Sequence, residues 1–263
     1  MKASKALIRI SKGILVFLFW IGIWFALSLR INSEFLFPSP QSVIKALYEL
    51  CLTAEFWKSA GYSLLRVLLG IIISLVVGTL LAIITKHSKL IHTLLSPLLV
   101  IIKTTPVASF IILALLWLDR NTLPLFVTSL IVIPIVWSNV SEGIENVDAE
   151  LVEVSKIYRF SALKRIKKLY IPTVMPYFMA ACRSSLGMAW KAGISAEVLS
   201  TPKNAIGTEL YFSKTYLETP SLFAWTMVVI LLSVIIEKLI FAGFERVYRG
   251  MHLIPKGAKH DKA

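Results

Sequence analysis

Residues 62–84 read YSLLRVLLGIIISLVVGTLLAII, and this stretch contains a single charged side chain, Arg66. A helix needs about 20 consecutive, mainly apolar residues to cross the roughly 30 Å hydrocarbon core of a bilayer. Five other segments of the chain have the same character. Together the segments predict six membrane-spanning helices, at about 10–29, 62–84, 94–118, 122–140, 172–199 and 221–243.

The composition of the whole chain agrees with this prediction. Of its 263 residues, 57% are hydrophobic and 16% are charged, whereas soluble domains average about 45–50% apolar and 25% charged. The long apolar blocks exclude a soluble enzyme, a disordered chain and a disulfide-rich scaffold. Cys51, Cys182 and the four histidines show no metal-ligand spacing. We therefore expect an all-α polytopic membrane protein, with residues 1–263 forming one transmembrane domain and no metal site.

The basic residues predict how the chain is oriented. With the N-terminus in the cytoplasm, and with Lys238 onward counted as the C-terminal tail, eighteen of the 28 Lys and Arg lie on cytoplasmic segments, six on outer segments and four within spans. Helical membrane proteins carry such an excess of Lys and Arg on their cytoplasmic loops. The apolar run at 10–29 is long for a signal peptide and has no convincing cleavage site, so we expect it to remain as the first span. Both termini are expected to be cytoplasmic.

Residues 141–171 form the longest predicted cytoplasmic segment. Its first half is acidic and its second half basic, and no Pro or Gly occurs between Asp148 and Leu169. Acidic residues early and basic residues late suit the dipole of a helix, and Ser161 can start a second helix. The pattern predicts a helix–turn–helix across the inner face. The alternative is a solvated charged loop whose basic residues lie at the lipid headgroups.

Particular residues of this segment resemble the loop motif of binding-protein-dependent ABC importer permeases. The family pattern is Glu-Ala-Ala, three residues, Gly, nine residues, then Ile-x-Leu-Pro. The corresponding residues here are Glu153-Val154-Ser155, Arg159 and Leu169-Tyr170-Ile171-Pro172. Because Gly permits a tight turn between two short helices, Arg159 in its place requires either a turn without positive φ or a strained one.

Other stretches resemble the permeases grouped with nitrate, sulfonate or taurine, and bicarbonate uptake, a subgroup that also includes vitamin-precursor permeases. The similarity covers roughly residues 35–245. The stretches that carry it are Phe37-Pro38-Ser39-Pro40, Lys103-Thr104-Thr105-Pro106, Glu142-Gly143-Ile144, Val147-Asp148-Ala149-Glu150-Leu151, Trp190-Lys191-Ala192 and Ala196-Glu197.

The resemblance implies the transmembrane permease subunit of an ATP-driven importer in a bacterial inner or plasma membrane, working by alternating access. Its expected partners are ABC ATPase subunits, which hold ATP and Mg, an extracytoplasmic solute-binding protein, the lipid bilayer and a second permease chain, as a homodimer. No cofactor, catalytic residue or nucleic acid is expected, and the chain contains no Gly-x4-Gly-Lys-Ser/Thr phosphate loop. The resemblance places the ATPase-coupling contact on Glu153, Val154, Ser155, Ile157, Tyr158, Arg159, Phe160, Leu163 and Lys164.

Ionisable residues within spans cost roughly 2.5–3.5 kcal/mol each on insertion scales, so each one is a candidate functional residue. The candidates for a translocation pathway are Lys103, Thr104, Thr105, Pro106, Arg183, Lys191 and Glu197. A positive lining from Lys103, Arg183 and Lys191 would suit a small anionic or polar solute. Structural pairing of Lys103 is an equal alternative. Glu197 can pair across helices or lie at an outer gate, and Arg66 can extend to the membrane surface.

A self-contained secondary transporter or channel is the alternative function. The absence of an inverted repeat and the few intramembrane acids available for an ion relay argue against it. An intramembrane enzyme would need a metal-binding cluster or a Gly-x-Ser-x-Gly nucleophile motif, and the sequence has neither. Gly187 and Gly193, in the fifth span, predict close helix approach or a break in the helix.

Overall fold

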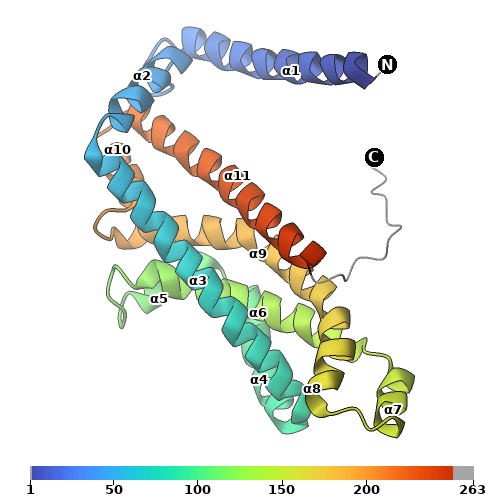
Figure 1. Cartoon of the computed structure of the whole chain (residues 1–263). Helices are drawn as coiled ribbons and strands as arrows, with labels where there is room; N and C mark the ends of the chain where they lie inside the picture. The colour runs from blue at the N-terminus through green and yellow to red at the C-terminus, as the bar shows by residue number, and fades with distance from the viewer. Residues whose placement is uncertain (1, 251–263) are drawn as a thin grey trace.

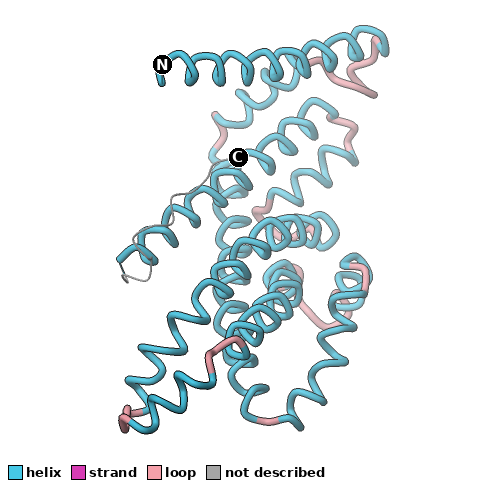
Figure 2. The backbone as a smooth tube through the Cα atoms, turned by 90° about the vertical axis from the view of Figure 1, so that its right-hand side faces the viewer, coloured by secondary structure: helices cyan, strands magenta, loops and turns pink. Residues whose placement is uncertain are grey.

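The structure, a computed structural model, describes residues 2–250 and the side chains of residues 11–243, and every regular element in this range is a helix. Figures 1 and 2 show these helices joined by short loops. The elements are α1 (Lys2–Ile31), α2 (Pro40–Cys51), α3 (Ala54–His87), α4 (Lys89–Thr104), α5 (Val107–Ala114), α6 (Leu123–Glu145), α7 (Ala149–Ile157), α8 (Ala162–Arg165), the π-helical segment η1 (Ile166–Tyr170), α9 (Ile171–Ser200), α10 (Ile206–Thr215) and α11 (Thr219–Gly250).

Four helical segments in the described part of the chain are long and apolar enough to cross a membrane. They are Ser11–Ile31, Ala54–His87, Leu123–Glu145 and Thr219–Gly243. The pair α4 and α5 would make a fifth if its two helices count as one span. Helix α9 covers the fifth predicted span but is not in this set, because charged and small polar side chains lower its apolar character. The all-helical class is confirmed, with four or five apolar spans.

The third predicted span, 94–118, is not one straight helix. Helices α4 and α5 are bent by 106° relative to each other. Thr105, just before Pro106, is extended, with φ −77° and ψ 135°, because proline clashes with a helical conformation of the residue before it. Proline alone does not decide the bend, since Pro97 and Pro134 lie inside the continuous helices α4 and α6.

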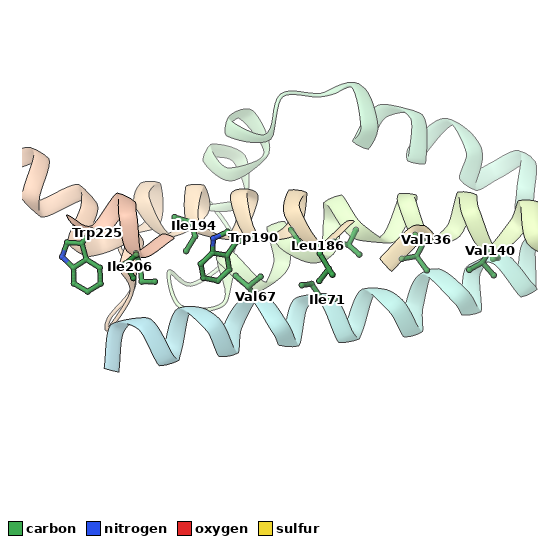
Figure 3. Packing of buried hydrophobic residues seen from close by; sticks show 14 of the residues in the cluster. Val67, Ile71, Val136, Val140, Leu186, Trp190, Ile194, Ile206 and Trp225 are labelled. Carbon is green, nitrogen blue, oxygen red and sulfur yellow. The ribbon is translucent and has the colours of Figure 1, made fainter. Parts of the chain in front are cut away.

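The core is built where α3, α6 and α9 pack together. Figure 3 shows Val67 and Ile71 of α3 beside Leu186 and Trp190 of α9, and all four are buried. Trp190 Nε1 also donates a hydrogen bond of 3.0 Å to the Val229 carbonyl, which joins α9 to α11. A buried indole needs such a partner, so this bond positions α11 against the core.

Gly193 lets α9 approach α3 closely, as its sequence position predicts. A Cβ at this position would lie 2.5 Å from Val67 Cγ2, which is too close for any larger residue. Gly187 has a different environment, since a Cβ at this position would meet no atom of another helix within 4 Å. Helix α9 runs unbroken from Ile171 to Ser200, so neither glycine interrupts the helix.

The remaining helices give the molecule two distinct ends. Figure 1 places α2 and α10 at one end, the α10 end, and α7 and α8 at the opposite end, the α7 end. Helix α1 extends away from the core in both views (Figures 1 and 2), and only 6% of the residues in its most apolar stretch are buried. Trp24 anchors its last part by stacking on Phe223 of α11, at 6.1 Å between ring centres. Apolar side chains on every face of α1 suit a lipid or protein environment.

Candidate functional site

The predicted coupling segment folds as two short helices, α7 and α8, joined by a turn at 158–161. Each helix has a side-chain cap at its start. The Asp148 carboxylate accepts a bond of 2.8 Å from the Glu150 amide, and the Ser161 hydroxyl accepts one of 3.3 Å from the Lys164 amide. Such caps satisfy amides that the first turn of a helix leaves without partners. Local sequence therefore suffices to define this pair, which we call the α7–α8 hairpin.

Arg159 holds the turn of this hairpin in a left-handed conformation, with φ 49°. The Phe160 amide donates to the Ser155 carbonyl and the Arg159 amide to the Lys156 carbonyl, each at 2.9 Å. This pair of bonds is the Schellman arrangement, which usually carries Gly at the left-handed position. Of the two possibilities that the replacement of Gly left open, the structure adopts the strained turn.

The predicted coupling residues lie mostly on the surface of the hairpin. Ile157 is 77% exposed, Tyr158 73% and Leu163 63%, and three large apolar side chains so exposed are unusual outside membranes and interfaces. The Lys164 ammonium lies 4.0 Å from the centre of the Phe160 ring. The exposed members are Glu153, Val154, Ile157, Tyr158, Arg159, Leu163 and Lys164; Phe160 is half-buried, and Ser155 is buried.

At the bend between α4 and α5, the predicted pathway residues make local contacts. Lys103 is exposed in the last turn of α4. The Thr104 hydroxyl donates to the Val100 carbonyl at 3.0 Å, and the Thr105 hydroxyl donates to the Ile101 carbonyl at 2.8 Å. Pro106 then precedes α5 without a capping side-chain bond. Both threonine hydroxyls therefore bond to carbonyls of their own helix.

Arg183 and Lys191 are exposed on α9. The Arg183 guanidinium carbon lies 5.2 Å from the centre of the Phe241 ring of α11, within the range of a cation–π contact. Within the described residues, no ion pair involves Lys103, Arg183 or Lys191. Among the described residues the three cations are therefore free of ion pairs, and none of them lines the cavity beside the α7–α8 hairpin.

Glu197, the remaining predicted pathway residue, is fully buried at the α10 end of α9. Its carboxylate accepts bonds from the Ser63 hydroxyl at 2.7 Å, the Gly207 amide at 3.1 Å and Arg66 Nη1 at 3.3 Å. A buried carboxylate requires this degree of pairing. Pairing of Glu197 across helices, one of its two predicted roles, is observed, and Arg66 is its partner.

Arg66 also holds the loop between α9 and α10. Its Nη2 donates to the Lys203 carbonyl at 2.7 Å and its Nη1 to the Asn204 carbonyl at 3.1 Å. Thr201 and Asn204 in this loop have φ values of 46° and 49°, which cost energy for residues with a Cβ and persist only where surrounding contacts impose them. We call Ser63, Arg66, Glu197 and the loop at 201–207 the α10-end network.

Sequence reasoning missed this network, although opposite charges in two apolar spans, on Arg66 and Glu197, were a signal for it. Gly207 gave no signal. A Cβ on this residue would lie 2.3 Å from Glu197 Cβ, so only Gly permits its amide to reach the carboxylate. Nearby, burial raises the pKa of Glu209 in α10, and the negative charge of Glu55 raises it further.

Comparison with known proteins places this geometry in a family. Residues 70–247 match the model of the binding-protein-dependent transport system inner membrane component. A putative aliphatic sulfonates transport permease protein of Bacillus subtilis is 27% identical over 219 residues, covering 81% of this chain and 78% of that protein. A nitrate import permease protein of Synechococcus elongatus is 26% identical over 191 residues, covering 68% of each chain.

Solved structures show the same fold. An amino acid ABC transporter crystallised with histidines superposes with a TM-score of 0.61 and 16% identity, over 77% of this chain and 97% of that chain. The MetNI methionine ABC transporter in an inward-facing conformation gives a TM-score of 0.53 and 18% identity, over 74% and 93%.

The family model spans more than half of the chain, and the apolar helices provide the membrane spans that such a protein needs. The chain is thus a multi-pass protein of the bacterial plasma membrane, and it belongs to the family of binding-protein-dependent transport system inner membrane components.

Proposed function

We propose that this chain is the permease subunit of an ATP-driven importer, with residues 1–263 as one transmembrane domain. It receives a small anionic or polar solute from an extracytoplasmic binding protein and releases it to the cytoplasm by alternating access. In this proposal α9 also spans the membrane, as the fifth of six spans, both termini are cytoplasmic, and two copies of the chain form the pore. A separate ATPase subunit hydrolyses ATP, and the permease itself catalyses no reaction.

The exposed apolar surface of the α7–α8 hairpin carries the proposal. Ile157, Tyr158 and Leu163 are exposed at the α7 end, where acidic and basic residues surround them. Aromatic and aliphatic side chains of this kind anchor protein interfaces when a partner covers them. We assign this surface to the ATPase, with Glu153 and Lys164 among the polar residues at its rim.

Helix continuity provides a way to transmit ATPase movement. Helix α8, η1 and α9 follow one another without a break in helical conformation, and α9 alone is 30 residues long, or about 45 Å. A displacement of the hairpin therefore moves α9 and reaches the α10-end network through Glu197. In this proposal the network alternates between the observed bonded arrangement and a released one, as a transporter gate requires.

The solute class rests on the exposed cations and on the relatives. Lys103, Arg183 and Lys191 are exposed without ion pairs among the described residues, and relatives are named for sulfonates, nitrate and bicarbonate. All three of these solutes are small anions. We propose that the cations face the pathway between two permease chains.

Lys191→Met should reduce uptake of the anion by the reconstituted importer, while Lys12→Met on α1 should not.

Capture of the ATPase tests the proposal directly. Tyr158→Ala should weaken ATPase binding by about 2 kcal/mol, roughly thirty-fold in Kd, as expected for a buried aromatic anchor. Tyr48→Ala on α2 is the matched control, because Tyr48 is 66% exposed and Tyr158 73%, and it should leave binding unchanged. Equal binding by both variants, or solute transport by the permease alone in liposomes, would contradict the proposal.

A further inference from the structure

A cavity of about 870 Å³ separates the α7–α8 hairpin from the ends of α3, α6 and α9. Its size lies within the range of about 300–1,000 Å³ that is typical of small-molecule sites. The hairpin therefore does not pack directly on the helices below it. The cavity is open to its surroundings, and much of its lining is apolar, so an amphipathic molecule can enter it.

The lining of the cavity changes from apolar to charged along its length. Ile83, Val140, Val174 and Phe178 provide apolar surface from α3, α6 and α9. On α3 the lining extends from Lys86 back to Thr79, which is roughly 10 Å along a helix. In the proposed orientation, on which this inference rests, the apolar part lies at the depth of the lipid acyl chains and the charged part at the headgroups.

The charged part has both signs. The Lys86 ammonium and the Glu145 carboxylate are paired at 3.7 Å, which leaves Glu153, Lys156 and Arg165 among the lining charges. The Nε atom of Arg165 is buried and has no hydrogen-bond partner among the described residues. A buried guanidinium donor without a partner is costly, and the planar guanidinium fork matches the geometry of a phosphate or a carboxylate group.

We propose that this cavity binds one phospholipid of the inner leaflet, namely phosphatidylethanolamine. Its phosphate contacts Arg165 and Lys156, its ammonium group contacts Glu153, and one acyl chain enters the apolar part between α3, α6 and α9. Basic residues between transmembrane helices at the cytoplasmic face bind the phosphates of lipid headgroups. The lipid fills the space beneath the hairpin and so supports it when the ATPase pushes on its other face.

Photo-crosslinking tests the assignment on the full-length protein. The protein is placed in phosphatidylcholine nanodiscs that contain phosphatidylethanolamine with a diazirine near the end of one acyl chain, and crosslinked residues are mapped by mass spectrometry. We expect crosslinks on Ile83, Val140 and Phe178. Arg165→Gln should reduce them about five-fold, the equivalent of roughly 1 kcal/mol for one basic contact, and Lys156→Gln, at an exposed position, should act in the same direction.

Lys168→Gln is the matched control, because Lys168 is an exposed basic residue of η1, three residues after Arg165, but does not line the cavity. Equal crosslinking by the Arg165, Lys156 and Lys168 variants would overturn the proposal, as would crosslinks confined to α1 and other lipid-exposed helices. A phosphatidylglycerol probe that labels as strongly would overturn the assignment to the ethanolamine headgroup. Crosslinking requires neither the ATPase nor transport. If the unmodified protein captures the ATPase but gives no crosslinks in the cavity, the lipid site alone is contradicted.

Discussion

Glu197 is the residue on which the polar contacts of the α10 end converge. Three donors from two other helices meet its carboxylate, and its side chain is fully buried. Its partners come from α3 and from the start of α10, so one side chain joins three elements. Removal of one member of a buried ion pair leaves the charge of the other member uncompensated. This costs far more free energy than the intact pair contributes to stability.

Glu197→Ala should therefore lower the free energy of unfolding by about 3–5 kcal/mol, since it removes the buried carboxylate that accepts bonds from Ser63, Arg66 and the Gly207 amide. The midpoint of thermal unfolding in detergent measures the effect. Glu197→Gln keeps an acceptor oxygen for Ser63 and Gly207 and should lose less. Glu49→Ala is the control, because Glu49 forms only an exposed pair with Lys45, at 3.9 Å, and should cost less than about 1 kcal/mol. Equal losses for Glu197→Ala and Glu49→Ala would rule out a structural role for the network.

Arg159 can be tested by restoring the Gly of the family motif. Arg159→Gly removes a left-handed strain of about 1–2 kcal/mol, partly offset by the greater freedom of Gly in the unfolded chain, so we expect a net gain of about 1 kcal/mol. Slower hydrogen exchange of the turn amides would report it. Arg159→Ala retains a Cβ and should show no such gain; similar exchange in both variants would mean that the turn is not strained.

Among the helices, the bend between α4 and α5 is the element that departs most from a simple span. Its angle of 106° turns α5 away from the axis of α4. Lys103 lies in the last turn of α4 and Pro106 just before α5. The bend therefore positions the exposed cation and the two threonines at a helix end, where carbonyl groups lack helical partners. The position of Lys103 depends on this bend.

Pro106→Ala should straighten the pair, because alanine permits the preceding residue to be helical and restores a backbone donor. Spin labels at Leu94 and Leu113, both exposed, would lie roughly 17 Å apart across the bend and roughly 28 Å apart in one straight helix. Double electron–electron resonance, with Cys51 and Cys182 replaced by alanine, measures this distance. An unchanged distance would show that tertiary contacts of α5, and not Pro106, impose the bend.

At the scale of the whole molecule, the two ends have different chemical character. The α7 end presents the charged hairpin and the cavity beneath it, whereas the α10 end contains the buried ion pair and the strained loop. Helix α9 connects them. This asymmetry suits a protein that receives energy at one membrane face and opens a gate at the other, and it makes the orientation in the membrane a decisive observation.

Labelling of single cysteines tests that orientation. In a variant with Cys51 and Cys182 replaced by alanine, Lys203→Cys at the α10 end should react with a membrane-impermeant maleimide in cells whose outer barrier is permeable to the reagent. Lys164→Cys at the α7 end should react only after the plasma membrane is permeabilised. Both lysines are exposed, so access to the reagent alone determines the result. The reverse pattern would contradict a cytoplasmic hairpin.

Sequence by itself predicted the helical class, the approximate position of the long apolar helices and a pair of short helices at the hairpin. These features depend on the length of apolar runs and on capping residues, such as Asp148 and Ser161, that act within a few residues. The family motif also predicted a tight turn at Arg159, whose backbone conformation depends on its immediate neighbours.

Only the tertiary structure decided the contacts that join distant segments. Arg66 and Glu197 are 131 residues apart and meet because α3 and α9 cross at the α10 end. The chain bends sharply at Pro106, whereas the helices that contain Pro97 and Pro134 are continuous. The presence of a proline therefore could not by itself predict the bend. The cavity beneath the hairpin likewise arises from the packing of several elements. Burial and pairing depend on which side chains surround a residue in space, and a linear pattern does not contain that information.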